Sequence, residues 1–143
     1  MMAHLPRFRK SVSIIPLLIF CGCIASCAPS LRSFAGAQSR IDDRLYFGRE
    51  IRGRGELTED EWRGFLRDIV TPRFPDGLTQ WNAEGQWRNS SGAIVHEGTF
   101  VLELIHPDSE RDDIAIAEII ERYKSLFHQE SVLRVKSAAS VGF

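Results

Sequence analysis

Cysteine is missing from most of this chain. All three cysteines, Cys21, Cys23 and Cys27, lie within the first 27 of its 143 residues. A disulfide bond within the segment that follows is therefore excluded, and that segment has to fold on its hydrophobic core alone. Proline and glycine are few as well, at 6 and 11 residues, which excludes collagen-like and low-complexity chains. A single compact α and β domain is the expectation.

Neither sign of charge dominates the sequence. The chain has 18 Lys and Arg against 19 Asp and Glu, for a formal net charge of −1. Arg7, Arg9 and Lys10 lie in the first ten residues, where no acid occurs, so the remainder carries more acids than bases. This balance argues against a general nucleic-acid binder, and we expect no nucleic acid among the partners.

Long apolar runs are also absent. The run at residues 11–24 is shorter than the roughly 20 residues of a membrane-spanning helix, and Pro16 interrupts it. Basic residues precede the run and small residues follow it, the order of a secretory signal. The sequence therefore predicts a cleaved signal peptide over residues 1–26.

The end of this leader resembles the lipobox of bacterial lipoproteins: Ile24-Ala25-Ser26-Cys27 has an aliphatic residue, two small ones and a cysteine. The resemblance implies that Cys27 becomes the first residue and carries the acyl chains. Residues 27–40 then form a flexible tether, and the membrane is a partner through this anchor. The protein would be exported to the cell envelope, and Ala28 after the cysteine implies an outer-membrane location facing the periplasm in a two-membrane bacterium. An ordinary signal peptide cut near Ala28 is the alternative.

Two helices and four strands are predicted over residues 41–143. Thr58 and Glu61 form a capping box that begins one helix, which Pro72 ends, and an acidic first turn after Pro107 begins another that runs to about His128. The expected strands are 44–48, 78–88, 94–105 and 132–136, with a hairpin turn at 89–92. The order β-α-β-β-α-β indicates an α+β, ferredoxin-like sandwich: an antiparallel sheet with two helices on one face.

Several stretches resemble the bacterial family catalogued as domain of unknown function 3574. They are Leu45-Tyr46-Phe47-Gly48, residues 71–79, Gly85-Gln86-Trp87, His106-Pro107-Asp108 and residues 129–135. The resemblance covers essentially all of the mature domain. It implies a small exported protein, often with a lipoprotein leader, and no established activity, cofactor or catalytic residue.

No motif in the chain points to a particular chemistry. The histidines have no metal-ligand spacing, so we expect neither a metal site nor a cofactor. His106 could be a base oriented by Asp108, although a surface histidine beside a helix cap is the more ordinary interpretation. The loop from Gly48 to Gly55 is basic and could hold an anion, but it lacks a phosphate-binding spacing and reads more simply as a solvated loop. We assign no catalytic residue.

The sheet face that the helices leave open is the surface of most interest. Strict alternation places Tyr46, Gln86, Glu103 and Arg134 on it, whereas a bulge near residues 78–81 would turn Trp81 and Trp87 outward instead. Such a face suits a small-molecule pocket or a homodimer, or it is merely solvated. The sequence thus predicts a lipid-anchored envelope protein that acts as a non-catalytic binding or interaction module. A small enzyme working on a small molecule at this face or at a dimer interface is the alternative.

Overall fold

The computed structural model describes residues 35–88 and 91–142, which belong to one compact unit, Leu31–Phe143. The predicted signal peptide, the lipobox-like stretch with Cys27 and residues 89–90 of the predicted hairpin turn lie outside the described residues. The strands are β1 (Gln38–Gly48), β2 (Glu50–Ile51), β3 (Gly55–Glu56), β4 (Thr79–Arg88), β5 (Ile94–His106) and β6 (Leu133–Val141). The helices are α1 (Glu59–Phe65), the π-helical turn η1 (Leu66–Val70) that continues it, and α2 (Glu110–Phe127).

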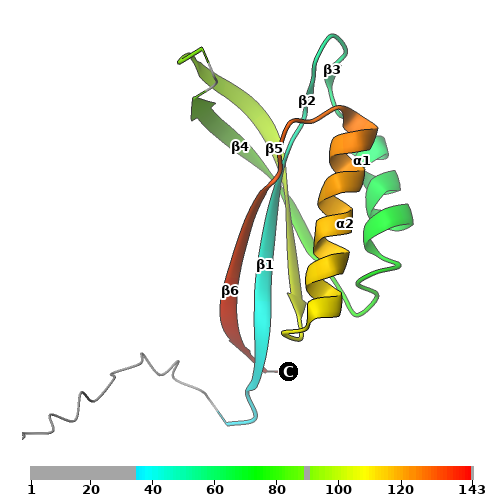
Figure 1. The fold of residues 1–143 in the computed structure, drawn as a ribbon, viewed down its shortest axis with the longest axis vertical. Helices are drawn as coiled ribbons and strands as arrows, with labels where there is room; N and C mark the ends of the chain where they lie inside the picture. Colours follow the sequence, from blue (N-terminus) through cyan, green and yellow to red (C-terminus); the bar gives the residue numbers. More distant parts are fainter. Residues whose placement is uncertain (1–34, 89–90, 143) are drawn as a thin grey trace, which may run out of the picture. The chain divides into compact units, whose positions relative to one another are not determined.

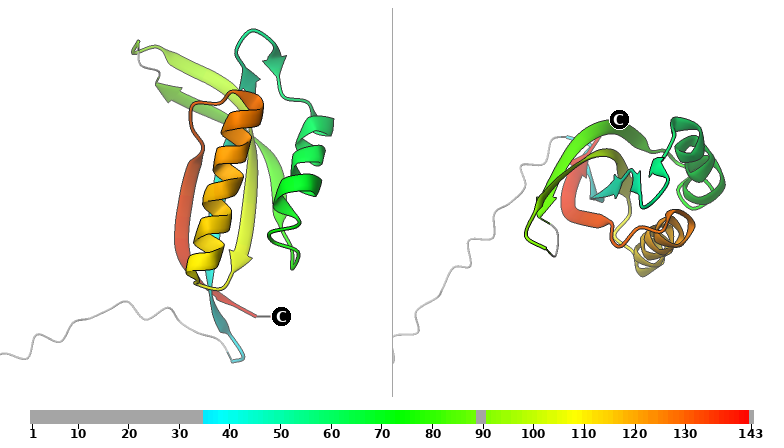
Figure 2. Two further views of the ribbon diagram at one scale, coloured as in Figure 1. Left: turned by 45° about the vertical axis from the view of Figure 1, so that its right-hand side comes forward. Right: turned by 90° about the horizontal axis from the view of Figure 1, so that it is seen from above.

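The main sheet has the strand order β4-β5-β1-β6, and every neighbouring pair is antiparallel. Both helices cover one face of it, as Figures 1 and 2 show. The first and third long strands are central, which is the ferredoxin-like arrangement that the sequence predicts. No helix of the described residues lies over the opposite face, which we call the open face.

The first strand begins earlier than the sequence indicates. Residues 38–40, expected in the tether, belong to β1 and pair with residues 139–141 of β6. The sequence also predicts β6 too short, because Ser137 to Val141 carry no hydrophobic alternation. The start of β1 and the end of β6 are both strands because they form hydrogen bonds with each other.

Local capping fixes both helices. Thr58 accepts a hydrogen bond from the Glu61 backbone N–H, and the Glu61 side chain accepts one from the Thr58 backbone, which completes the predicted capping box. Ser109 caps α2 by accepting from the Asp112 backbone N–H. At the other end of α2, His128 takes the left-handed conformation, with φ 53°, a position usually held by glycine.

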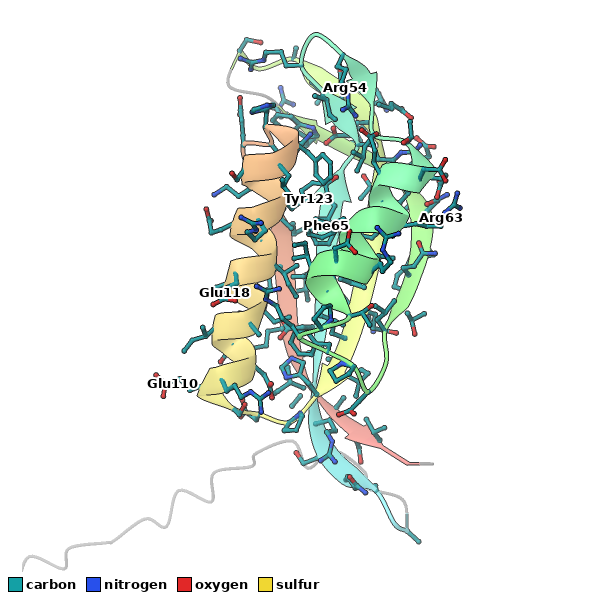
Figure 3. All side chains as sticks on the ribbon, turned by 90° about the vertical axis from the view of Figure 1, so that its right-hand side faces the viewer. Arg54, Arg63, Phe65, Glu110, Glu118 and Tyr123 are labelled. Carbon is teal, nitrogen blue, oxygen red and sulfur yellow. The ribbon has the colours of Figure 1, made fainter. Side chains whose placement is uncertain are left out.

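The core lies between the helices and the central strands. Leu45 and Phe47 of β1 and Phe100, Leu102 and Leu104 of β5 meet the helices there, and all are fully buried. The Trp62 indole stacks on Phe100 with ring centres 4.6 Å apart. Phe65 and Tyr123 point toward each other from the two helices, with their rings 5.2 Å apart (Figure 3). Aromatic side chains from α1 and α2 thus fill the helix side of the sheet.

A small arm that the sequence does not predict, the hairpin of β2 and β3, extends the loop after β1. The arginines in this loop are engaged by carboxylates: Arg49 with Glu56 at 3.4 Å, Arg52 with Glu130 and Arg54 with Glu61. Arg49 also lies over the Phe100 ring, 4.6 Å from its centre. These ion pairs favour a structural role for the basic loop over the binding of an anion.

Candidate functional site

A large hollow lies on the open face, where β1 ends. It has a volume of about 1130 Å³, and we call it the sheet groove. Strands β1, β4 and β5, the start of β6, the arm and the α2–β6 connection all contribute to its walls. Seen from above in Figure 2, the β4–β5 hairpin arcs round the sheet, so the open face is concave at this end.

The side wall of the groove is tied together by two contacts between segments far apart in sequence. Arg52 Nη2 and Glu130 Oε1 lie 3.1 Å apart, and Gln129 Nε2 donates to the Glu50 carbonyl oxygen at 2.6 Å. They join the arm to the connection that follows α2. His128, whose left-handed backbone turns the chain out of α2, also lines the groove.

Among the residues that line the groove, Glu97 has a carboxyl whose pKa is shifted by its surroundings. Burial raises the pKa of this carboxyl, hydrogen bonding from the Trp87 side chain and the Glu50 backbone lowers it in part, and the charge of Glu50 raises it further, so that the net pKa lies above the usual range. A partly buried carboxyl with a raised pKa in a groove is typical of a functional site.

Gly48 and Gly85 lie so close to side chains of β5 that a Cβ atom at either position would collide with them. A Cβ atom on Gly48 would lie 2.8 Å from Glu97 Oε1, so the carboxylate occupies the space that a side chain at position 48 would take. A Cβ atom on Gly85 would lie 2.8 Å from the Thr99 hydroxyl. The glycines at these positions are therefore explained by close approach to β5 side chains rather than by a turn.

The four side chains expected at the open face are not brought together. Tyr46 and Gln86 both line the groove. Glu103 lies on the open face beyond the groove, where it accepts from Arg44 Nε at 2.9 Å. Arg134 is on the helix side of the sheet, since it is paired in register with Leu45. The predicted group of four is therefore wrong as a single site.

Placing Gln86 and Arg134 on the same face as Tyr46 is also wrong. Trp81 and Trp87 pair in register with Val101 and Val95 and lie on the open face, 40% and 46% exposed, with no bulge in the ladder. Gln86 pairs with His96 and lies on the other face, and it borders the groove because β4 is the edge strand. Beside Trp81 the helix side is already filled by Trp62 of α1, which stacks on Phe100 and donates its indole N–H to Gln80 at 3.2 Å.

Arg134 instead belongs to a buried ion network between the sheet and α2. It donates to both carboxylate oxygens of the fully buried Asp43, at 2.6 and 2.7 Å, and to Asp113 at 2.5 Å. His106 Nε2 lies 2.9 Å from Asp43 Oδ2, and its Nδ1 lies 2.8 Å from the Pro107 carbonyl oxygen. The aspartate that orients His106 is thus Asp43 rather than Asp108, and the buried ring reaches no groove.

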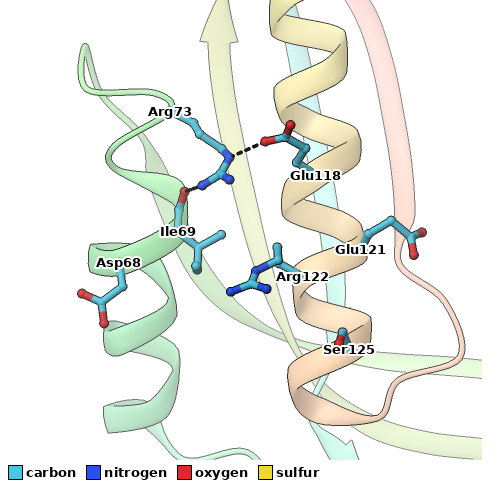
Figure 4. Close-up of a pocket in the computed structure, with 7 residues that line it drawn as sticks. All are labelled: Asp68, Ile69, Arg73, Glu118, Glu121, Arg122 and Ser125. Atoms are coloured by element: carbon cyan, nitrogen blue, oxygen red, sulfur yellow. Dashed lines mark hydrogen bonds and ion pairs between the residues drawn. The ribbon is translucent and has the colours of Figure 1, made fainter.

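A second hollow, of about 750 Å³, lies between η1 and α2 (Figure 4). Arg73 crosses it, donating to Glu118 at 3.0 Å and to the Ile69 carbonyl oxygen at 2.8 Å. Asp68 and Glu121 are paired with neighbours on their own helices, Arg67 and Lys124, and Arg73 with Glu118, so this hollow is the weaker candidate. Within residues 35–88 and 91–142 there is no group of three or more His, Cys, Asp or Glu that could hold a metal ion. In the same ranges no helix is long and apolar enough to cross a membrane.

Comparison with known proteins identifies the family. The sequence profile of a family described as "Protein of unknown function (DUF3574)" matches residues 42–143. The chain belongs to this family. No curated protein is similar enough to the sequence to count as a match.

Solved structures with a similar fold come from other proteins. A phage SAM lyase in complex with S-methyl-5'-thioadenosine superposes with a TM-score of 0.56 at 17% identity, over 80% of this chain and 95% of that chain. CutA from Synechococcus elongatus gives a TM-score of 0.49 at 14% identity, over 73% of this chain and 83% of that chain. Identities this low show the fold alone, and the family description assigns no activity.

Proposed function

We propose that this protein is a lipid-anchored component of the cell envelope whose domain binds a small molecule in the sheet groove without transforming it. The observation that carries the binding role is the concave groove itself, which combines the exposed indole of Trp87 with the partly buried Glu97 carboxyl. Concave sites with apolar walls and a few placed polar groups are the usual form of small-molecule sites. The lipobox at residues 24–27 supports the anchor.

The binding role is tested with a pair of matched substitutions on β6. Leu133 lines the groove and Val135 does not, yet both lie on the open face and both are exposed. A library of small molecules is titrated into the Leu31–Phe143 unit, which contains the whole described core, and the nuclear magnetic resonance shifts of the Trp87 indole N–H are followed. Leu133→Trp should weaken the binding of molecules that shift this signal, and Val135→Trp should not. If no molecule moves the groove signals, the binding role is wrong.

The anchor is tested separately by mass spectrometry of the membrane fraction. We expect an amino-terminal Cys27 with acyl chains, and a Cys27→Ala protein should lose its membrane attachment. An unacylated terminus beyond Cys27 would contradict the lipoprotein interpretation.

A small enzyme is the second candidate, and the raised pKa of Glu97 favours it, because a carboxyl that keeps its proton to a higher pH is better suited to act as a general acid. Turnover of a bound molecule that Glu97→Gln abolishes would establish this alternative.

A second copy of the chain on the open face is the partner alternative, since Trp81, Ile105 and Val135 are exposed there. In that case Val135→Trp would shift the mass measured by light scattering.

A further inference from the structure

The sheet groove has an excess of negative charge. Glu50, Glu84, Glu97 and Glu130 all line it, whereas the basic residues among its walls are Arg52 and His128. Arg52 is already paired with Glu130 at 3.1 Å. The other three carboxylates form no ion pair with any residue in the ranges 35–88 and 91–142.

The other acidic side chains of the open face are compensated. Arg44 donates to Asp42 at 2.7 Å and to Glu103 at 2.9 Å, so that one guanidinium serves both carboxylates. Glu97 lies on the same strand and the same face as Glu103, six positions away, but it has Glu50 as its charged neighbour instead of an arginine. A half-buried carboxylate beside a like charge is unfavourable unless a cation joins it.

The strands on both sides of β5 carry aromatic rings that line the groove. Trp87 of β4 interacts with Glu97 directly through its side chain, and Tyr46 of β1 lines the groove as well. Indole and phenol rings attract cations through the negative charge of their faces, and tryptophan does so most strongly. Carboxylates together with aromatic walls are the combination that recognises organic ammonium groups.

From this charge and this lining we propose that the sheet groove binds a small organic cation, a positively charged group attached to a flat or apolar body. The charged group lies between Glu97, Glu50 and the Trp87 ring, and the body packs along Tyr46 and Leu133. The inference rests on the proposed binding function and names its ligand class. A bare metal ion is disfavoured because two of the walls are aromatic and apolar.

The test compares three probes that share a phenethyl group and differ in charge: phenethylammonium, phenethyl alcohol and hydrocinnamate. Each is titrated into the Leu31–Phe143 unit at neutral pH, and the Trp87 indole signal is followed. The cation should bind about tenfold more tightly than the neutral alcohol, and the anion more weakly than either. Equal or tighter binding of the alcohol or the anion would overturn the inference while leaving a binding groove in place. If neither the three probes nor the library shifts the Trp87 signal, the proposed binding function itself is refuted.

Two substitutions assign the effect to the carboxylate. Glu97→Gln keeps the shape and removes the charge, so it should weaken the cation about fivefold or more and leave the alcohol unchanged. Glu103→Gln, on the same strand and face but outside the groove, is the matched control and should leave both unchanged. Gly48→Ala provides a second route, because its Cβ atom would displace the flexible end of Glu97 without touching the backbone. Unaltered cation binding in both Glu97→Gln and Gly48→Ala would refute the role of this carboxylate.

Discussion

Asp43 of β1 is a buried carboxylate that contacts Arg134 of β6 and His106 at the end of β5, and its loss should destabilise the fold strongly. The side chain is fully buried and accepts hydrogen bonds from Arg134 at 2.6 and 2.7 Å, with His106 Nε2 at 2.9 Å. Asp43→Asn keeps the shape but removes the charge, and it replaces one of the two carboxylate oxygens that accept from Arg134 with an amide N–H₂. Arg134 then loses one acceptor and the negative charge that offsets its burial.

Removing one partner of a buried ion pair costs about 3 to 5 kcal/mol. Arg134 is a quarter exposed and keeps Asp113 as a second acceptor, so the cost should fall near the lower limit, at about 3 kcal/mol. For a domain of this size that loss lowers Tm by roughly 12 °C. Urea unfolding followed by circular dichroism, together with a thermal scan, measures both quantities.

The pH dependence of this substitution has a definite sign. Burial alone would raise the pKa of the Asp43 carboxyl, but hydrogen bonding and charge from Arg134 and His106 outweigh it and hold the pKa below its ordinary value. The stabilisation is therefore present above the unfolded-state pKa of about 3.9 and is lost as the pH falls through the lowered folded-state pKa. The difference between wild type and Asp43→Asn should be full at pH 7 and should shrink below about pH 4.

Asp113→Asn is the matched control for this experiment. Hydrogen bonds from Lys136 and Arg134 lower the pKa of Asp113 to about 2, yet the side chain is 39% exposed, so water replaces the lost contacts. Its substitution should destabilise the protein less than Asp43→Asn does. An Asp43→Asn protein as stable as wild type, or more stable than Asp113→Asn, would refute the account of the buried network.

Three further outcomes follow from single contacts. Thr58→Ala removes the capping-box acceptor and should cost about 1 kcal/mol in urea unfolding; a change near zero would mean that α1 does not depend on its cap. Tyr123→Phe deletes the 2.9 Å hydrogen bond to the Gly48 carbonyl oxygen and should cost about 1 kcal/mol, with an unchanged circular dichroism spectrum as the control for folding. Glu97→Gln should stabilise the protein at neutral pH, because the raised folded-state pKa makes ionisation unfavourable as the pH rises, and the gain should vanish at low pH; a loss of stability at pH 7 would contradict this.

Elements whose signals are local could be predicted from the sequence. The capping box at Thr58 needs only Glu61, three residues on, and the alternation of Phe100, Leu102 and Leu104 identifies a central strand by itself. Together with the helix stripes, these signals are enough for the order of elements and the ferredoxin-like arrangement. Sheet order then follows, because short connections and antiparallel pairing leave few alternatives.

The faces of the edge strands could not be predicted, because distant residues decide them. Arg134 reads as a solvent-facing residue until Asp43 and Asp113, which lie 91 and 21 positions earlier, provide its partners on the helix side. Trp81 fits a core position by its polarity, but Trp62 of α1 fills the helix side beside it. In both strands, the polarity of a residue predicted the wrong face of the sheet. Helix-side positions on an edge strand are covered by a few particular side chains, so a polar residue there can be buried and an apolar one can face outward.

Glu97 could not be predicted as a site residue for the same reason, and its surroundings indicate what the groove binds. A glutamate between Val95 and Thr99 in a strand looks like an ordinary solvated residue, and only the folded chain gives it a glycine at position 48 and a like charge at position 50. A domain selected for stability alone would place an arginine here, as it does beside Glu103. An acidic side chain kept partly buried without such a partner lowers stability in the empty protein. That loss is recovered when a cation binds, because ligands that favour the folded state stabilise it in proportion to their affinity. The groove and its unpaired carboxylate are therefore best understood together, as a site whose electrostatic balance is completed from outside the chain.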